Sequence, residues 1–155
     1  MGLLESSRER ALGVLGKVQW LAPLLGRLAV GLVFMSTGWG KVHNIPKVIA
    51  FFTELGIPAP GFHAYLVAYS ELLCGTALVI GLLTRLATVP LIVSMIVAIL
   101  TAKRADLHGL FDLVGFDEFT YLVVLVMIAI LGPGSASVDA VLTKQLGWKP
   151  PAPAA

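Results

Sequence analysis

The sequence of 155 residues has few charged side chains and a single cysteine. Charged residues make up 13% of the chain, about half of what a soluble domain usually carries, whereas hydrophobic residues make up 57%. So few charges cannot cover the surface of a soluble domain of this length, which argues against a cytosolic enzyme, a disordered tail and a nucleic-acid-binding protein. Cys74 alone can form neither an intramolecular disulfide, nor a CxxC redox pair, nor a thiolate metal cage. An integral membrane protein is the class that this composition leaves.

The sequence also lacks the short motifs of common catalytic and nucleotide-binding sites. It contains no G-x-G-x-x-G, P-loop, H-E-x-x-H or Ser/His/Asp signature, and its basic residues form no stripe of the kind that nucleic acid needs. His43, His63 and His108 are scattered without metal-ligand spacing, and we interpret them as ordinary interfacial residues. We therefore expect no metal site and no nucleic-acid partner.

Four apolar segments predict four membrane-spanning helices, at about residues 20–37, 62–83, 86–102 and 119–131. A helix needs roughly 20 apolar residues to cross a bilayer core, and the fourth segment is about two thirds of that length. Either Asp117 and Glu118 lie just inside the membrane, or the bilayer thins around a short helix. Apolar side chains at helical spacing after Lys41 predict a short interfacial helix in the first outer loop. The sequence thus predicts an all-α integral membrane protein with a four-transmembrane-helix bundle.

Composition divides the chain into three parts. We expect an amphipathic N-terminal segment at residues 1–19, a membrane domain at residues 20–142 and a Pro/Ala-rich tail at residues 143–155. Four spans place both termini on the same side of the membrane. That side carries Arg8, Arg10, Lys17, Arg85, Lys144 and Lys149, whereas the opposite side carries Lys41, Lys47, Lys103 and Arg104. The excess of basic residues favours cytoplasmic termini by a small margin.

Two charged residues, Arg27 and Glu71, fall inside the predicted spans. A charge at the bilayer centre costs about 2.5–3.5 kcal/mol on insertion scales, so it persists only when it is paired, hydrated or used. Helical rise counted from the inner ends of the two spans gives these residues a depth difference of about 7 Å. An extended arginine side chain covers that distance, so an Arg27–Glu71 pair is allowed if the two helices are neighbours.

Three interpretations of these two residues stay open. The pair fixes the register of two helices and does no chemistry. Alternatively, it lines a polar pocket for a quinone head group, an oxyanion or a proton. In the third interpretation the residues do not pair, and Arg27 extends to lipid phosphates.

Charged and small residues recur in an order that resembles the DoxX family of small four-helix membrane proteins. The resemblance covers about residues 27–139, which is most of the chain. It is carried by Arg27-x-x-x-Gly31-x-x-Phe34-x-x-x-Gly38-x-x-Lys41, Phe52-x-x-x-Gly56-Ile57-Pro58-Ala59-Pro60, Glu71-x-x-x-Gly75-x-x-Leu78-x-x-Gly81-x-x-Thr84-Arg85, Met95, Glu118 and Gly132-Pro133-Gly134-x-x-Ser137-Val138-Asp139. The charged motif positions are Arg27, Lys41, Glu71, Arg85 and Glu118.

The resemblance implies a multi-pass protein of the cytoplasmic (inner) membrane of a prokaryote. Some members of the family are linked to quinone-dependent thiosulfate oxidation, and others to membrane oxidoreductase complexes that handle oxidative stress. The first hypothesis is therefore a membrane subunit or anchor of an oxidoreductase system, with Arg27 and Glu71 as an intramembrane polar site and a quinone as its ligand. This chain has no dithiol and no recognisable cofactor motif, so electron transfer requires a soluble or membrane redox partner.

Two alternatives stay open beside that hypothesis. One is a non-enzymatic membrane scaffold in which an Arg–Glu pair is purely structural. The other, ranked last, is a small solute or proton carrier, which requires a homo-oligomer because four spans make a thin wall for a pore. Whether the chain itself catalyses a reaction stays open in all of these hypotheses.

Overall fold

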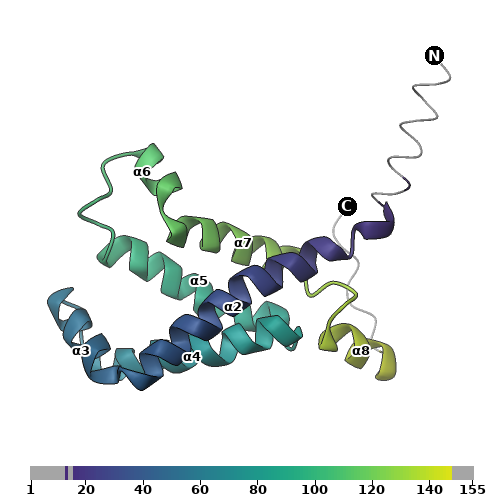
Figure 1. Cartoon of the computed structure of the whole chain (residues 1–155), viewed down its shortest axis with the longest axis horizontal. Helices are drawn as coiled ribbons and strands as arrows, with labels where there is room; N and C mark the ends of the chain where they lie inside the picture. Colours follow the sequence, from purple (N-terminus) through teal and green to yellow (C-terminus); the bar gives the residue numbers. More distant parts are fainter. Residues whose placement is uncertain (1–12, 14–15, 148–155) are drawn as a thin grey trace, which may run out of the picture.

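The computed structural model describes residue 13 and residues 16–147, and this part of the chain is all-helical (Figure 1). Most of the predicted amphipathic segment, with Arg8 and Arg10, lies outside the described residues, as does the end of the tail with Lys149. The helices of the described part are α2 (Leu21–His43), α3 (Ile45–Glu54), α4 (Pro60–Ile80), α5 (Thr84–Thr101), α6 (Leu110–Gly115), α7 (Asp117–Leu131) and α8 (Val138–Gln145).

Three helices of the described part are long and apolar enough to cross a membrane. They are the helix at Gly16–His43, which includes α2, and the helices α4 and α5. The first three predicted spans are thus confirmed as helices of spanning length. The fourth, α7, has only 15 residues and falls short of that length. The short helix predicted after Lys41 is present as α3.

Proline and glycine set the helix ends that give the chain its path. Pro46 and Pro60 lie in the first turns of α3 and α4, where a missing N–H removes no helical hydrogen bond. Gly81 ends α4 at a φ of 73°, in the left-handed region where glycine is unstrained. The chain then turns sharply, and α5 begins at Thr84.

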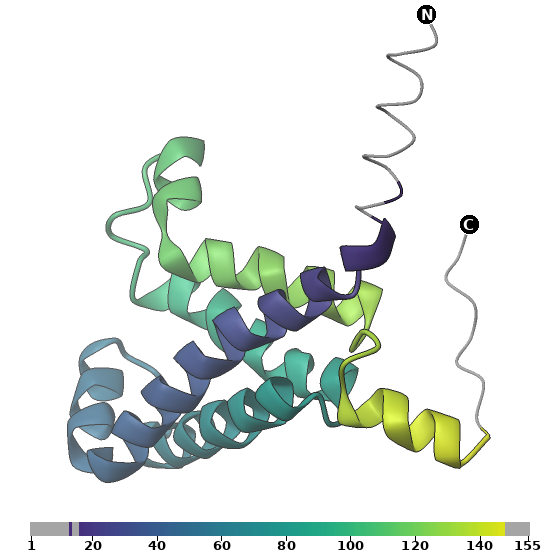
Figure 2. The ribbon, with the colours of Figure 1, turned by 45° about the vertical axis from the view of Figure 1, so that its right-hand side comes forward.

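The bundle consists of two helix pairs, because α2 packs along α4 and α5 packs along α7. Figures 1 and 2 show the pairs close together near the α4–α5 turn and far apart near α3 and α6. The apolar core lies where the pairs meet, and its fully buried side chains include Phe34, Leu78, Leu91 and Leu125. The bundle is therefore closed at the α4–α5 turn and open at the opposite end.

Glycines allow α2 and α4 to approach each other closely. A Cβ atom at Gly75 of α4 would lie 2.5 Å from the backbone nitrogen of Met35 in α2. A Cβ atom at Gly38 of α2 would overlap the backbone of Leu72 in α4. These contacts fix the register of the two helices, since Gly38 must lie level with Leu72 and Gly75 level with Met35.

Candidate functional site

Glu71 lies near the middle of α4, and it is 2% exposed. Its carboxylate accepts hydrogen bonds from Lys41 Nζ at 2.5 Å and from Thr37 Oγ1 at 2.9 Å. Both donors lie on α2, one helical turn apart, on the side that faces α4. The Lys41 side chain is 31% exposed, so a buried anion is paired with a cation that extends into open space. Such charge-assisted hydrogen bonds offset the cost of burying the carboxylate.

Arg27 is not the partner of Glu71. It is 1% exposed, and its Nη2 donates a hydrogen bond to the carbonyl oxygen of Ala136, in the loop between α7 and α8. The register of α2 and α4 places Arg27 beside Gly81, whereas Glu71 lies level with Gly38. At about 1.5 Å of rise per residue, Arg27 and Gly38 are on the order of 16 Å apart along α2.

The depth estimate that allowed this pair was wrong about the relative offset of the helices, and the structure agrees with the interpretation in which Arg27 and Glu71 do not pair. That depth estimate assumed that the inner ends of the first two spans lie at the same level. In the structure, the first helix begins well before the level at which α4 ends, because the glycine contacts rather than the helix ends set the register. Hydropathy defines how long a span is, but it carries no information on this offset.

Arg27 instead belongs to a polar cluster at the closed end, here called the Arg27 cluster, whose members are Arg27, Gly81, Thr84, Ala136 and Asp139. The Asp139 carboxylate accepts hydrogen bonds from the backbone nitrogens of Leu83 at 2.7 Å and Thr84 at 2.9 Å. The Asp139 nitrogen donates to the Gly81 carbonyl oxygen at 2.9 Å. Asp139, in the first turn of α8, therefore caps the start of α5 and joins α8 to the α4–α5 turn.

The Arg27 cluster is tightly packed at Gly81, and the Arg27 Nε and Nη1 atoms are buried without a hydrogen-bond partner among the described residues. A Cβ atom at Gly81 would overlap the Arg27 guanidinium and the Ser137 side chain. Arg85 lies at the same end, where its Nη2 donates to the Ile130 carbonyl oxygen at 3.2 Å. Arg27 and Arg85 thus connect helices through backbone carbonyl groups, which is a structural arrangement.

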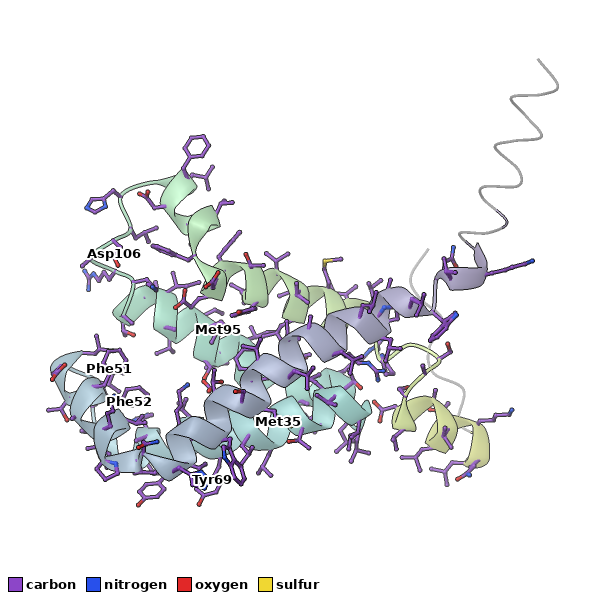
Figure 3. The ribbon with its side chains drawn as sticks, in the orientation of Figure 1. Met35, Phe51, Phe52, Tyr69, Met95 and Asp106 are labelled. Atoms are coloured by element: carbon purple, nitrogen blue, oxygen red, sulfur yellow. The ribbon has the colours of Figure 1, made fainter. Side chains whose placement is uncertain are left out.

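A cavity of about 1100 Å³ lies at the open end, between the two helix pairs. Its walls come from α2, α3, α4 and α5, with Glu118 contributed by α7. Figure 3 shows Phe51 and Phe52 on α3, and Met95 across from them on α5; all three line the cavity. Most lining side chains are apolar, and Thr37, Lys41 and Glu71 form a polar patch in this apolar wall. Ligand sites commonly combine an apolar lining with a few polar groups in this way.

A second Glu–Lys pair lies on the opposite wall of the cavity. Glu118 Oε1 is 3.9 Å from Lys103 Nζ, and both side chains are partly exposed. Lys103 Nζ also lies 5.6 Å from the centre of the Phe116 ring. Of the five charged motif positions, Lys41, Glu71 and Glu118 therefore line the cavity, and Arg27 and Arg85 lie at the closed end.

Two contributions to this site were not predicted from the sequence. Thr37 was assigned only as the end of a span, and nothing in its position marks it as a donor to Glu71. The aromatic wall formed by Phe51 and Phe52 was predicted only as part of an interfacial helix. One signal was available for Lys41, because the spacing of Lys41 from Gly38 places both residues on one face of α2.

The ring nitrogens of the three histidines bond to backbone carbonyl groups of their own segments. His43 Nδ1 lies 2.9 Å from the Trp39 oxygen, and His63 Nδ1 lies 2.7 Å from the Pro58 oxygen. His108 Nδ1 lies 3.1 Å from the Asp106 oxygen. Within residue 13 and residues 16–147, no group of three or more His, Cys, Asp or Glu side chains is arranged to hold a metal ion.

Comparison with known proteins shows where related sequences occur. Residues 22–104 match the sequence profile of the DoxX family. The chain is 37% identical to the uncharacterized membrane protein Rv3486 of Mycobacterium tuberculosis, over 77% of this chain and 80% of that protein. It is 35% identical to the "Putative oxidoreductase CatD" of Bacillus subtilis, over 74% of this chain and 81% of that protein. It is 26% identical to the inner membrane protein YqjF of Escherichia coli, over 83% of this chain and 98% of that protein. No solved structure matches the chain.

Proposed function

The chain belongs to the DoxX family of membrane proteins, and on this premise we propose that it is a membrane subunit or anchor of an oxidoreductase system that binds a quinone beside Lys41 and Glu71. The name of the relative CatD supports the link to an oxidoreductase. The inner membrane relatives of Escherichia coli support a location in the cytoplasmic membrane. The observation that carries the proposal is a buried, paired carboxylate in the wall of a large apolar cavity.

The residues of the cavity fit the chemistry of a quinone. A quinone has a flat apolar ring, which the aromatic and aliphatic walls from α3 and α5 accommodate. Its ring oxygens need hydrogen-bond donors, and the partly exposed ammonium group of Lys41 supplies them. The Lys41 ammonium has three N–H groups, so one can hold Glu71 while another reaches a ligand oxygen.

Three polar side chains of the cavity wall would then have defined tasks. A quinone bound there would take up two electrons and two protons on reduction to a quinol. Lys41 would orient a ring oxygen, and Glu71 would take each proton from solvent on the side where Lys41 is partly exposed and pass it to a ring oxygen. The Thr37 hydroxyl group donates a hydrogen bond to Glu71 Oε2 and so fixes the orientation of the Glu71 side chain. Electrons come from a partner protein, because no dithiol or cofactor motif is present in the sequence.

We also propose that α7 is the fourth span. It packs along α5, and apart from Thr120 its residues from 119 to 131 are apolar. Its 15 residues rise about 22 Å, which is less than the roughly 30 Å core of a bilayer, so the membrane thins locally around it. With four spans, both termini lie on the side where basic residues are in excess, which is the cytoplasm.

A non-enzymatic scaffold is the second candidate function. The observation that favours it is the complete pairing of Glu71, because a carboxylate held by Lys41 and Thr37 is stable without any ligand. In this case the cavity is filled by lipid, and the protein serves only to hold partners at the membrane.

Binding of menadione to the purified full-length protein in nanodiscs tests the proposal. We expect Lys41→Met and Glu71→Gln to weaken binding about tenfold, because a hydrogen bond to a charged group contributes roughly 1.5–3 kcal/mol. Lys144→Met, on α8 and away from the cavity, is the matched control and should bind as the wild type does. Menadione binding that is absent from the wild type, or unchanged in both cavity variants, would favour the scaffold.

A further inference from the structure

A second, shallower hollow lies on the outer face of α4, and we call it the α4 groove. Its volume is about 390 Å³, and its lining residues are Phe62, Tyr65, Leu66, Tyr69, Ser70, Leu73 and Cys74. Figure 3 shows Tyr69 on the outside of the bundle, turned away from the cavity. Leu66 and Ser70 line both the α4 groove and the cavity. The two hollows therefore meet along one turn of α4.

The α4 groove faces the surroundings of a helix that is long and apolar enough to span a membrane. Phe62 and Leu73, at its two ends, are 67% and 66% exposed. In a bilayer these side chains contact hydrocarbon rather than water, so an occupant of the groove must be apolar. The groove extends over about 18 Å of α4, from Phe62 to Cys74, which suits an extended chain and not a compact molecule.

We infer that the α4 groove holds the hydrocarbon tail of the ligand whose head group lies beside Lys41 and Glu71. This inference rests on the proposed function, and it adds the class of ligand: a membrane-dissolved molecule with a long isoprenoid tail. Ser70 immediately precedes Glu71 and lines both hollows, so a head group at Glu71 lies next to the edge of α4 that the two hollows share. Leu66 and the small side chain of Ser70 form the threshold that the tail crosses.

This arrangement also defines the route of entry. The head group moves from the lipid across the threshold into the cavity, and the tail stays outside on α4. The head group therefore reaches Lys41 without crossing water. The aromatic residues Phe62, Tyr65 and Tyr69 hold the tail against the helix, since flat rings pack well against a branched chain.

Two ligands that share a head group test this assignment: menadione, which has no tail, and menaquinone-4, which has four isoprene units. The variant Leu66→Trp places a bulky ring at the threshold. Leu86→Trp is the matched control, because Leu86 on α5 is 66% exposed and lines neither hollow. Affinities are measured on the full-length protein in nanodiscs. Because Leu66 also lines the cavity, the readout is the ratio of the two affinities. We expect Leu66→Trp to weaken menaquinone-4 binding at least fivefold more than it weakens menadione binding, with no change in either affinity for Leu86→Trp.

A second variant covers the case in which Leu66→Trp does not fold. Leu73→Ala removes groove surface at a residue that lines the groove but not the cavity, and it should weaken menaquinone-4 about threefold without affecting menadione. If menadione binds but both variants leave the preference for menaquinone-4 unchanged, the groove is occupied by ordinary lipid and the inference is overturned. If menadione does not bind to the wild type at all, the proposed function itself fails, and the tail assignment fails with it.

Discussion

The two ends of the bundle both bury a charged residue, but they treat it differently. At the closed end, Arg27 lies tightly against Gly81 and donates to a backbone carbonyl group. At the open end, Glu71 is equally buried, yet its partner Lys41 extends into a large cavity. A buried charge that bonds to backbone groups in a packed cluster holds the fold together. A buried charge whose partner faces open space is available to a ligand.

The closed end should be the more sensitive of the two to small changes in packing. Gly81→Ala would push a Cβ atom into the Arg27 guanidinium at a φ of 73°. We expect a loss of roughly 4 kcal/mol in the free energy of unfolding, as is common when a buried charged group loses its partners. Thermal unfolding of the wild type and the variant in detergent measures this loss of stability.

Gly56→Ala is the matched control for that substitution. Gly56 has a φ of 70°, but no atom lies within 4 Å of the Cβ position. The Gly56→Ala variant therefore introduces only backbone strain, which should lower the free energy of unfolding by about 1 kcal/mol. Equal losses for the two variants would mean that the packing around Arg27 contributes nothing.

Substitutions at the open end should affect stability and ligand binding to different extents. Lys41→Met leaves the Glu71 carboxylate buried without its cation, and we expect a loss of about 3 kcal/mol in stability. The double variant Lys41→Met/Glu71→Gln removes both charges and should recover most of that loss. It should not recover menadione binding. A double variant that regains both properties would assign the pair a purely structural role.

Weakening the cap of α5 should reduce stability less than Gly81→Ala or Lys41→Met does. Asp139→Asn keeps one acceptor oxygen, so only one of the backbone nitrogens of Leu83 and Thr84 retains its hydrogen bond, and the charge is removed. The expected loss is about 1 kcal/mol, in the range of a weakened helix cap, and menadione affinity should be unchanged. Unfolding curves and binding isotherms of the same preparation show whether the two properties separate. A change in affinity larger than threefold would connect the closed end to the ligand site.

The contrast between the ends also explains what the sequence could reveal. Helix positions follow from hydropathy, and the resemblance to DoxX proteins was carried by residues that the structure divides between the two ends. Arg27 and Glu71 were identified because charges are rare in apolar segments. The partner that each of them has in the structure was not predictable, because Gly38 and Gly75 set the offset of α2 and α4 through contacts that no periodicity shows.

The cavity itself left little trace in the sequence. It exists because the two helix pairs diverge toward α3 and α6, and that divergence arises from tertiary packing. The Asp139 cap likewise joins residues more than fifty positions apart. Local patterns predict helices and their ends, whereas contacts of this kind depend on how the helices are arranged.

Photo-crosslinking with an azido-naphthoquinone tests most directly which end of the bundle holds the ligand. The full-length protein in nanodiscs is irradiated with the probe, with and without excess menadione, and the labelled peptides are identified by mass spectrometry. We expect menadione-sensitive adducts on the cavity walls, in the peptides that contain Phe52 of α3 and Met95 of α5. Specific labelling confined to residues 132–139, beside Arg27, would contradict the assignment of the ligand to the open end.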